Sequence, residues 1–262
     1  MLLATTIHRA PSAVSDYAKA RAAALGIPYR ERTGNVSQMK ETDADTLLVY
    51  GKHGVTLLDG DNTYAYHTGT AAVRLLSLQR GERDRLCSLL PAGTKTVLDA
   101  TFGEGKDSLV LSYFLGERGR VTALEKSTAL YEIGRDAIGR YQDPNPDTTA
   151  ALRRISLVHA DMREFLETAA ESSFDVVYLD TMFRVPVNRE TVNVEAFRAA
   201  AAKDTVDEPL LSAALRVAAK AVIVKERPFS KIFRAFSFTE IEHKKGQPTA
   251  YGIIRKEAAE NR

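Results

Sequence analysis

An acidic residue and an aromatic residue, Asp180 and Phe183, follow one of the most apolar runs of the chain at a spacing of three residues. A carboxylate and a ring on one tight turn supply a hydrogen-bond acceptor and a stacking surface, which suits a planar base. Hydrogen bonds from an exocyclic amine to Asp180 and to the Thr181 carbonyl would favour a pyramidal nitrogen, while Phe183 holds the base flat. Asp180 and Phe183 are therefore the candidate catalytic residues, and Thr181 and Phe183 are candidate substrate-binding residues. The alternative is a strand-end aspartate beside a phenylalanine of the core.

A second candidate segment is the loop that contains Gly103 and Gly105. Two glycines allow the backbone to turn sharply and to approach a ligand before a helix begins. A dinucleotide-binding loop needs a third glycine three residues after the second, and this chain has Ser108 there. The loop therefore fits a nicotinamide dinucleotide poorly and indicates another cofactor. An ordinary glycine-rich turn is the alternative.

Two carboxylates flank this loop. Asp99 stands four residues before the first glycine, where an acid is expected if the loop must hold the cationic amino and sulfonium groups of S-adenosylmethionine. Asp107 lies in the first turn of the following helix, where it could bind the amino group or could instead cap the helix. We therefore predict an S-adenosylmethionine site at this loop.

The ends of the next two predicted strands carry groups that suit a nucleoside. The number of residues between Asp99 and Glu125 is near the spacing at which a carboxylate meets ribose hydroxyls in nucleotide-binding α/β folds. Lys126 would then lie beside the adenine. Asp161 can accept a hydrogen bond from the adenine amino group, and Met162 can pack on the ring. Each carboxylate has a structural alternative, Glu125 as a solvated strand-end residue and Asp161 as a helix N-cap.

The elements that would position these residues alternate between strands and helices. We predict strands over 96–100, 120–125, 155–160, 174–180 and 221–226, separated by helices near 106–116, 127–141, 162–171 and 207–218. Such alternation is typical of a mostly parallel sheet covered by helices. The segments 237–243 and 249–256 are joined by a loop too short for a crossover helix and predict an antiparallel hairpin. We therefore predict an α/β fold of the class I methyltransferase, Rossmann-like type, with a seven-stranded sheet that ends in this hairpin.

The first part of the chain has a different pattern. It predicts a helix near 14–25, short strands near 46–51 and 54–60, and, after the segment 62–67, a helical stretch that ends at Leu90. We therefore divide the chain into a small N-terminal α+β lobe, residues 1–92, and a catalytic domain, residues 93–262. Within the catalytic domain, the polar and turn-rich residues 142–149 predict a surface loop.

With these motifs assembled, the chain resembles the RsmJ-type family of small-subunit ribosomal RNA guanine-N2 methyltransferases. The family segments D-A-T-x-G-x-G-[RK]-D, L-E-[RK], I-H-A, Y-L-D-P-M-F and V-V-K-R-P read here DATFGEGKD, LEK, VHA, YLDTMF and IVKERP. The resemblance covers most of residues 96–230. Two departures are Thr181, which replaces a proline and restores a backbone N–H, and Glu226, which is inserted before Arg227.

The resemblance implies S-adenosylmethionine as cofactor and RNA of the small ribosomal subunit as partner. It carries the cofactor contacts onto Lys106, Asp107, Glu125, Lys126, Asp161, Met162 and Asp180. Lys225 and Arg227 stand where the fifth strand ends and could neutralise RNA phosphate as substrate-binding residues, or could be ordinary surface charges.

Composition argues against several other classes of protein. Apolar residues make up 44% and charged residues 27%, as in soluble globular domains, and no apolar run approaches the roughly 20 residues of a membrane helix. The first residues lack the charged and apolar regions of a signal peptide, so we expect a cytoplasmic protein. The histidines show no metal-ligand spacing, and Cys87 stands at helical spacing typical of a buried hydrophobe, so we expect neither a metal site nor a disulfide.

We therefore predict an S-adenosylmethionine-dependent methyltransferase that acts on the exocyclic N2 of a guanine in small-subunit ribosomal RNA. A net charge of +2 neither requires nor forbids nucleic acid, so a methyltransferase for a small molecule or another amine stays open. From other classes, Ser108 and the terminal hairpin disfavour a nicotinamide-linked oxidoreductase. A non-catalytic RNA- or cofactor-binding module would bind cofactor without turnover.

Overall fold

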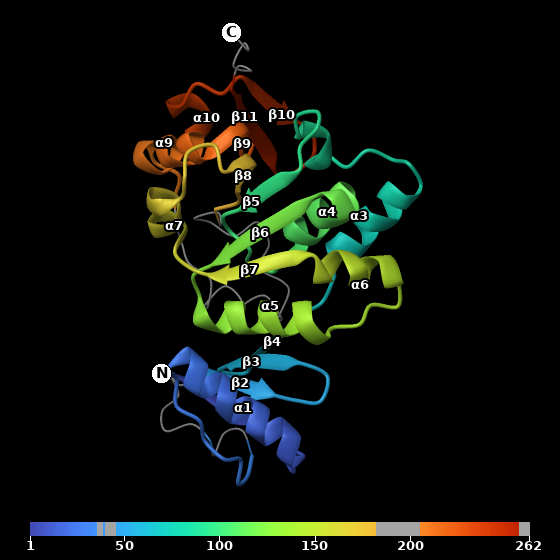
Figure 1. The fold of residues 1–262 in the computed structure, drawn as a ribbon, viewed down its shortest axis with the longest axis vertical. Helices are drawn as coiled ribbons and strands as arrows, with labels where there is room; N and C mark the ends of the chain where they lie inside the picture. Colours follow the sequence, from blue (N-terminus) through green and yellow to red (C-terminus); the bar gives the residue numbers. More distant parts are fainter. Residues whose placement is uncertain (36–38, 40–45, 182–204, 257–262) are drawn as a thin grey trace. The chain divides into compact units, whose positions relative to one another are not determined.

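A computed structural model describes residues 1–35, 39, 46–181 and 205–256 (Figure 1). Its contacts divide the chain into two compact units. The first comprises the described residues of Met1–His67 together with Ser127–Gln142, and the second comprises Thr68–Lys126 and the described residues from Asp143 onward. Because this grouping follows contacts and not independent folding, the predicted domain boundary at residue 92 stays a prediction.

The first unit is built on a four-stranded sheet in the order β1-β2-β3-β4. The strands are β1 (Leu2–Thr6), β2 (Thr46–Tyr50), β3 (Val55–Asp59) and β4 (Asn62–Ala65), with β1 parallel to β2 and the other pairs antiparallel. Helix α1 (Ser12–Leu25) packs against β1, and helix α5 (Thr128–Arg140) packs against β3. Strand β1 was not predicted, because its short apolar run has no alternation and no turn signal before it.

The second unit contains a seven-stranded sheet in the order β10-β11-β9-β8-β5-β6-β7. Its parallel strands are β5 (Thr96–Asp99), β6 (Arg120–Glu125), β7 (Ile155–His159), β8 (Phe174–Leu179) and β9 (Ala218–Glu226). Strand β11 (Ala250–Arg255) is antiparallel to both β9 and β10 (Glu240–His243). The predicted fold class is therefore confirmed. The apolar runs in β8 and β9 lie in the middle of the sheet, where a parallel strand is buried on both faces.

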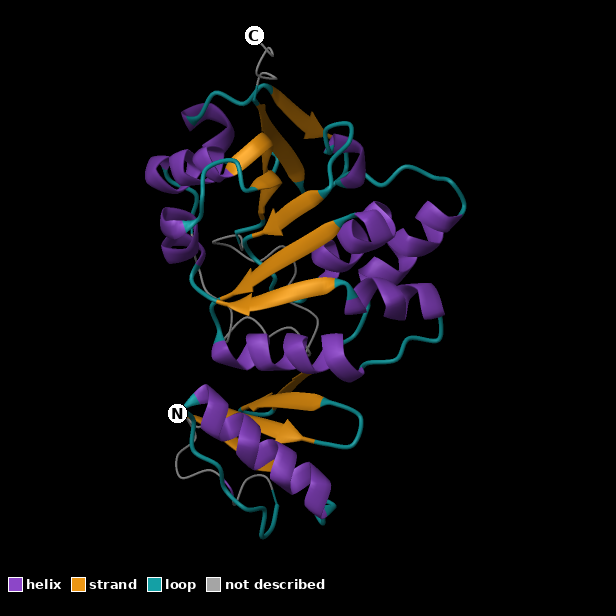
Figure 2. Ribbon diagram, in the orientation of Figure 1, coloured by secondary structure: helices purple, strands orange, loops and turns teal. Residues whose placement is uncertain are grey.

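Helices cover both faces of this sheet (Figure 2). On one face, α4 packs against α3 and α6, and on the other face α7 packs against α9, which contacts β8 and β9. The helices are α3 (Thr70–Gln79), α4 (Lys106–Leu115), α6 (Pro146–Arg153), α7 (Met162–Thr168), α9 (Glu208–Val217) and α10 (Ile232–Ala235), with 3-10 turns at Cys87–Leu89 and Gly116–Arg118. Four of the predicted helices are therefore confirmed within a few residues, α5 among them.

The predicted surface loop over 142–149 is wrong in its second half, because α6 begins there. Asn145 is the N-cap of α6, and its side chain accepts a hydrogen bond from the Asp147 N–H at 3.0 Å. Pro146 occupies the first helical position, where its missing N–H has no cost. The asparagine and proline that resembled turn residues are therefore a helix start.

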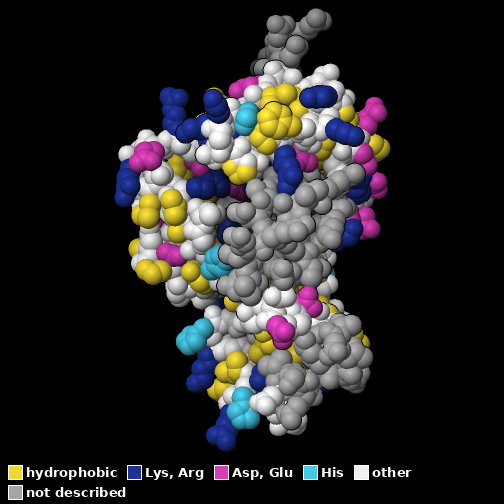
Figure 3. Space-filling view, turned by 180° about the vertical axis from the view of Figure 1, so that it is seen from behind, with side chains coloured by type: hydrophobic (Ala, Val, Ile, Leu, Met, Phe, Trp, Pro, Cys, Tyr) yellow, Lys and Arg dark blue, Asp and Glu magenta, His cyan; other side chains and the backbone are white. Residues whose placement is uncertain are grey.

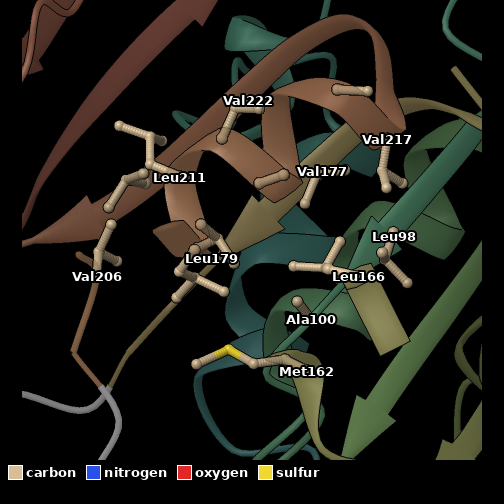
Figure 4. Packing of buried hydrophobic residues seen from close by; sticks show 14 of the residues in the cluster. Leu98, Ala100, Met162, Leu166, Val177, Leu179, Val206, Leu211, Val217 and Val222 are labelled. Carbon is tan, nitrogen blue, oxygen red and sulfur yellow. The ribbon is translucent and has the colours of Figure 1, made fainter. Parts of the chain in front are cut away.

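The core of the second unit lies on both faces of its sheet. Figure 4 shows the cluster under α7 and α9, in which Leu98, Val177 and Val222 come from three neighbouring strands. A second cluster, which includes Val97, Val176 and Leu111 of α4, fills the opposite face. Successive residues of one strand point to opposite faces of the sheet, and both faces are covered. Val97 and Leu98 are therefore both buried, as are Val176 and Val177.

Two findings bear on the expected classes of site. In the described part of the chain, no helix is long and apolar enough to cross a membrane. Nor do three or more His, Cys, Asp or Glu side chains gather there in a way that could hold a metal ion. Cys87 is a buried free thiol, as its helical spacing predicts.

A buried ion pair joins α1 to α5 within the first unit. Glu132 of α5 has no exposed surface, and its carboxylate accepts hydrogen bonds from Arg21 Nε at 3.0 Å and from Arg21 Nη2 at 2.7 Å. The Tyr50 hydroxyl of β2 donates to the same carboxylate at 3.2 Å. The charge is therefore tolerated in the core because three donor groups satisfy it.

Replacing Arg21 alone tests this ion pair. Arg21→Met is expected to lower the free energy of unfolding by about 3 kcal/mol, because the Glu132 charge stays buried without its guanidinium. The double variant Arg21→Met with Glu132→Leu should recover part of that loss. Urea denaturation followed by circular dichroism measures both, and equal losses in the single and the double variant would contradict the assignment.

Candidate functional site

The predicted site residues converge at one edge of the second unit's sheet. Asp99 ends β5, Glu125 ends β6, and Asp180 directly follows β8. In the strand register, Asp99 lies opposite Tyr178, and Glu125 lies opposite His159 at the end of β7. Parallel strands end at the same edge, and this edge is where ligands bind in open α/β sheets. The site is therefore assembled by sheet topology from segments far apart in sequence.

The glycine loop is shaped by two left-handed residues and by a neighbouring ring. Gly103 has φ 55° and Gly105 has φ 71°, a region that residues with a side chain rarely adopt. A Cβ on Gly105 would lie 2.4 Å from Cζ of Phe102, which is itself buried. The Gly103 N–H donates to Glu125 Oε2 at 2.9 Å. The loop thus has a defined shape, and Glu125 takes part in holding it.

Asp99 lies beneath this loop and is almost fully buried. Its Oδ2 accepts a hydrogen bond from the Ser108 hydroxyl at 2.6 Å, and its Oδ1 accepts one from the Thr101 N–H at 3.1 Å. Burial raises the pKa of the Asp99 carboxyl to about 7 in spite of these donors. Ser108 therefore has a second role besides excluding a dinucleotide fingerprint, because it holds the Asp99 carboxylate in place.

Asp107 lies at the centre of a buried ionic cluster. Its Oδ1 pairs with Arg74, and its Oδ2 accepts hydrogen bonds from the Tyr178 hydroxyl and from Lys225 Nζ, both at 2.8 Å. Burial opposes its ionisation, but the charges of Lys225 and Arg74 outweigh burial and hold the pKa of Asp107 well below its usual value. The capping alternative is wrong, because Gly105 is the N-cap of α4 and no side chain caps that helix.

Lys225 connects this cluster to Asp180. Its Nζ lies 2.7 Å from Asp180 Oδ2, and its side chain is only 19% exposed. Burial and the charge of Asp107 raise the pKa of Asp180, whereas the Lys225 ammonium lowers it. The Asp180 N–H donates to Thr101 Oγ1 at 2.7 Å, which fixes the turn after β8. Among the described residues no group donates to Asp180 Oδ1.

The structure places three further residues of the predicted cofactor site as follows. Asp161 is the N-cap of α7, with its side chain accepting from the Arg163 N–H at 2.7 Å, and its Oδ2 lies 2.5 Å from Lys126 Nζ. The capping alternative for Asp161 is therefore confirmed, and its contact with adenine stays a prediction. Met162 packs in the core cluster beside Ala100 (Figure 4), and its contact with an adenine ring also stays a prediction.

The remaining predicted residues have the following positions. Lys106 pairs with Glu104 at 2.6 Å, and Thr181 is buried directly after Asp180. Arg227 follows β9, and its backbone N–H donates to Glu226 Oε1 at 2.7 Å. Phe183 lies outside the described residues, so its predicted place against a base stays a prediction. The roles of Lys225 and Arg227 toward RNA phosphate are likewise untested.

Sequence reasoning missed the cations and donors that surround Asp107. Arg74 of α3 donates from Nε and Nη2 to Asp84 at 2.7 and 2.9 Å while also pairing with Asp107. Tyr178 was quoted only as part of a motif, although its hydroxyl reaches Asp107. An arginine in an amphipathic helix resembles a surface residue, so no local signal identified Arg74.

The charge balance of this edge suits a cationic ligand. Four carboxylates, those of Asp99, Asp107, Asp180 and Glu125, gather with the ammonium of Lys225 and the guanidinium that Arg74 shares with Asp84. The raised pKa values of Asp99 and Asp180 have the same origin, since buried carboxylates without enough positive charge resist ionisation. An amino or sulfonium group would lower both pKa values. The residues therefore fit the charge of S-adenosylmethionine.

The chain is similar to several known proteins. Residues 37–245 match a family model described as "Putative SAM-dependent methyltransferase". The Bacillus subtilis protein YpiP is 30% identical over 260 residues, which is 96% of this chain and 98% of that protein. Ribosomal RNA small subunit methyltransferase J of Hydrogenovibrio crunogenus is 33% identical over 144 residues, which is 53% of this chain and 50% of that protein.

A solved structure has the same fold. The crystal structure of a SAM-dependent methyltransferase from Neisseria gonorrhoeae superimposes with a TM-score of 0.63 and 21% sequence identity. The alignment covers 97% of this chain and 95% of that one. At this identity the likeness supports the arrangement of the sheet and helices.

Substitution of Gly105 tests the loop geometry. Gly105→Ala is expected to weaken cofactor binding at least tenfold, because the new methyl group must displace the Phe102 ring as well as adopt a left-handed φ. Gly81→Ala is the matched control in the same unit, since Gly81 has φ 79° and open space around its Cβ position. Calorimetric titration gives both affinities. Equal affinities for the two variants would refute the role assigned to the loop.

Proposed function

Because this chain belongs to the family of S-adenosylmethionine-dependent methyltransferases, we propose that it methylates the exocyclic N2 amino group of a guanine in small-subunit ribosomal RNA. S-adenosylmethionine is the cofactor, and when bound it supplies a methyl carbon made electrophilic by the sulfonium. The RNA substrate is inferred from the RsmJ-type motifs and from relatives named for ribosomal RNA methylation. Guanine N2 is inferred from the RsmJ-type resemblance, and the chemistry of the turn after β8 supports an exocyclic amine on a planar base.

The observation that carries this proposal is the set of hydrogen-bond partners of the Asp180 carboxylate. Lys225 Nζ holds Oδ2 at 2.7 Å, and no described residue donates to Oδ1. An amine conjugated to a base ring is a weak nucleophile, since its lone pair is delocalised. A hydrogen bond from its N–H to Oδ1 turns the nitrogen toward a pyramidal geometry and aims the lone pair. Lys225 is a positioning residue in this scheme, because it fixes and ionises the acceptor.

The step balances without a strong base. The amine nitrogen forms a bond to the methyl carbon as the carbon–sulfur bond breaks, and the nitrogen then carries an extra proton. A methylated aryl ammonium is acidic, so water can take that proton while Asp180 keeps its ion pair with Lys225. Asp180 therefore acts by orientation and electrostatics, and Asp99, Glu125 and the glycine loop bind the cofactor.

Basic side chains suited to RNA phosphate occur on the second unit. Figure 3 shows Lys and Arg side chains at several places on the face of this unit that is turned away in Figure 1. Lys225 is paired with two carboxylates, so we assign the phosphate contact at the end of β9 mainly to Arg227. Such contacts favour any RNA and leave the choice of base to the pocket.

Asp180→Asn tests the orienting carboxylate. The variant should lower kcat for methyl transfer by about 100-fold or more, because the amide is a weaker acceptor and no longer pairs with Lys225. The dissociation constant of S-adenosylmethionine should change only a few-fold. Asp147→Asn, the same substitution at an exposed position of the second unit, is the control. A kcat within threefold of wild type would exclude this role.

The pH dependence of cofactor binding tests Asp99. Its pKa of about 7 in the free protein lies above the usual value, so the carboxyl is protonated below pH 7 and ionised above it. A cationic ligand favours the ionised form, so affinity should fall by up to about tenfold per pH unit below pH 7 and level off above it. Calorimetry between pH 5.5 and 8.5 measures this, and Asp99→Asn should flatten the profile. An unchanged slope in that variant would assign the titration to another group.

The reaction itself is tested by methyl transfer to small ribosomal subunits and to their extracted RNA, both from cells that lack this protein. Labelled S-adenosylmethionine and nucleoside mass analysis identify the product. N2-methylguanosine is the expected outcome. Label at another nucleoside would correct the base, and no label with cofactor bound would refute the RNA substrate.

A further inference from the structure

The first unit contains a cavity of about 380 Å³ that the reaction described above does not use. Its walls come from β3, β4 and α5, and residues of the loop between β2 and β3 lie at its rim. The volume lies within the range of small-molecule sites in proteins. Every described lining residue belongs to the first unit.

One part of the wall is aromatic and apolar. The rings of Tyr66 and Tyr141 lie 5.1 Å apart at an angle of 75°, and both line the cavity. Val55 and Ile133 add aliphatic surface. Tyrosine rings beside aliphatic groups form a surface on which a planar base can stack, whichever base it is.

The carboxylate of Asp136 lines this cavity. Asp136 of α5 is only 3% exposed, and its Oδ1 accepts hydrogen bonds from the Tyr17 hydroxyl at 3.2 Å and from Arg140 Nε at 2.7 Å. No described residue donates to its Oδ2, which lies 3.6 Å from the position a Cβ would take on Gly54. A carboxylate oxygen to which no described residue donates can accept a hydrogen bond from a ligand. Ring and exocyclic N–H groups of bases are suitable donors.

Positive charge is placed at the rim by a tight turn. The Gly51 N–H donates to the Gly54 carbonyl at 2.9 Å, and this leaves Lys52 and His53 exposed at the tip. In the part of the chain that the structure describes, neither side chain forms an ion pair with a carboxylate. An ammonium next to an aromatic cavity matches the layout of a nucleotide, in which a phosphate stands beside a base.

We propose that this cavity binds a nucleotide of the RNA substrate other than the methylated one. The base stacks on Tyr66 and donates an N–H to Asp136 Oδ2, and its phosphate contacts Lys52. This inference rests on the proposed function, since it assigns a second contact with the same RNA. The recognition chemistry is that of a nucleotide, so the test includes free mononucleotides as well as RNA.

The test uses the whole chain of 262 residues with Lys52→Ala and Tyr66→Ala. Lys52→Ala should weaken binding of a fluorescent ribosomal RNA fragment and reduce the slope of log affinity against log salt by about 0.7, the value for one phosphate contact in single-stranded RNA. Tyr66→Ala should raise KM for RNA about tenfold through lost stacking. Neither variant should change kcat or the dissociation constant of S-adenosylmethionine.

Lys19→Ala is the matched control, because it removes an exposed positive charge from the same unit outside the cavity lining. Thermal melting checks that Tyr66→Ala is folded. If that variant does not fold, Lys52→Ala still tests the proposal, because Lys52 is exposed and its replacement should not affect folding. RNA affinity and salt slope equal to wild type in Lys52→Ala would overturn the proposal. So would an effect of Lys19→Ala as large as that of Lys52→Ala.

A mixture of the four ribonucleoside monophosphates separates the two sources of nucleotide. Weak competition with RNA, lost in Lys52→Ala, supports the RNA assignment. Tight mononucleotide binding that leaves RNA affinity unchanged would overturn it in favour of a free nucleotide. If wild-type protein binds RNA through Lys52 but methylates none, the proposed function fails, and of this inference only the contact between the cavity and RNA stands.

Discussion

The Lys225 ammonium lies between the carboxylates of Asp107 and Asp180, and the rest of the site depends on this bridge. A site for a cationic ligand needs several acids at one sheet edge, yet acids brought together out of water repel one another and take up protons. Lys225 and Arg74 resolve this conflict by leaving Asp107 firmly ionised and Asp180 anchored at one oxygen. The bridge also ties β9 to α4 and to the turn after β8, which links the proposed acceptor Asp180 to the helix that follows the glycine loop.

The fold was largely predictable because its strands are continuous apolar runs, which central parallel strands such as β8 and β9 require. The positions of Asp99, Glu125 and Asp180 at one sheet edge were predictable because each stands at a strand end, and their roles toward a ligand stay predictions. Arg74 and the pairing of Lys225 were not, because their partners come from other elements and an isolated basic residue resembles a surface charge. Strand β1 was not predicted for a related reason, since it pairs in parallel with β2, which lies far from it in the sequence.

Asp161 and Asp107 were each interpreted as either a ligand contact or a helix cap, and only Asp161 caps a helix. The position of each residue relative to the start of its helix explains the difference. Asp161 directly precedes the first residue of α7 with an extended backbone, so its side chain can reach the Arg163 N–H. Asp107 lies within the first turn of α4 after a left-handed glycine, so its side chain points to other partners. The offset from the helix start, which residue types alone do not specify, therefore decides between capping and ionic pairing.

Helix α5 follows β6 after only two residues, yet its Glu132 pairs with Arg21 of α1 and with Tyr50 of the N-terminal sheet. The two units are therefore interleaved along the chain, and no single cut separates them. A fragment that begins after His67 would contain α5 without the residues that pair with Glu132. A fragment that ends at His67 would lack α5, which forms one wall of the cavity in the first unit. Gene fusion or deletion could not readily exchange one unit without the other, so we expect the N-terminal sheet and the methyltransferase sheet to be inherited together.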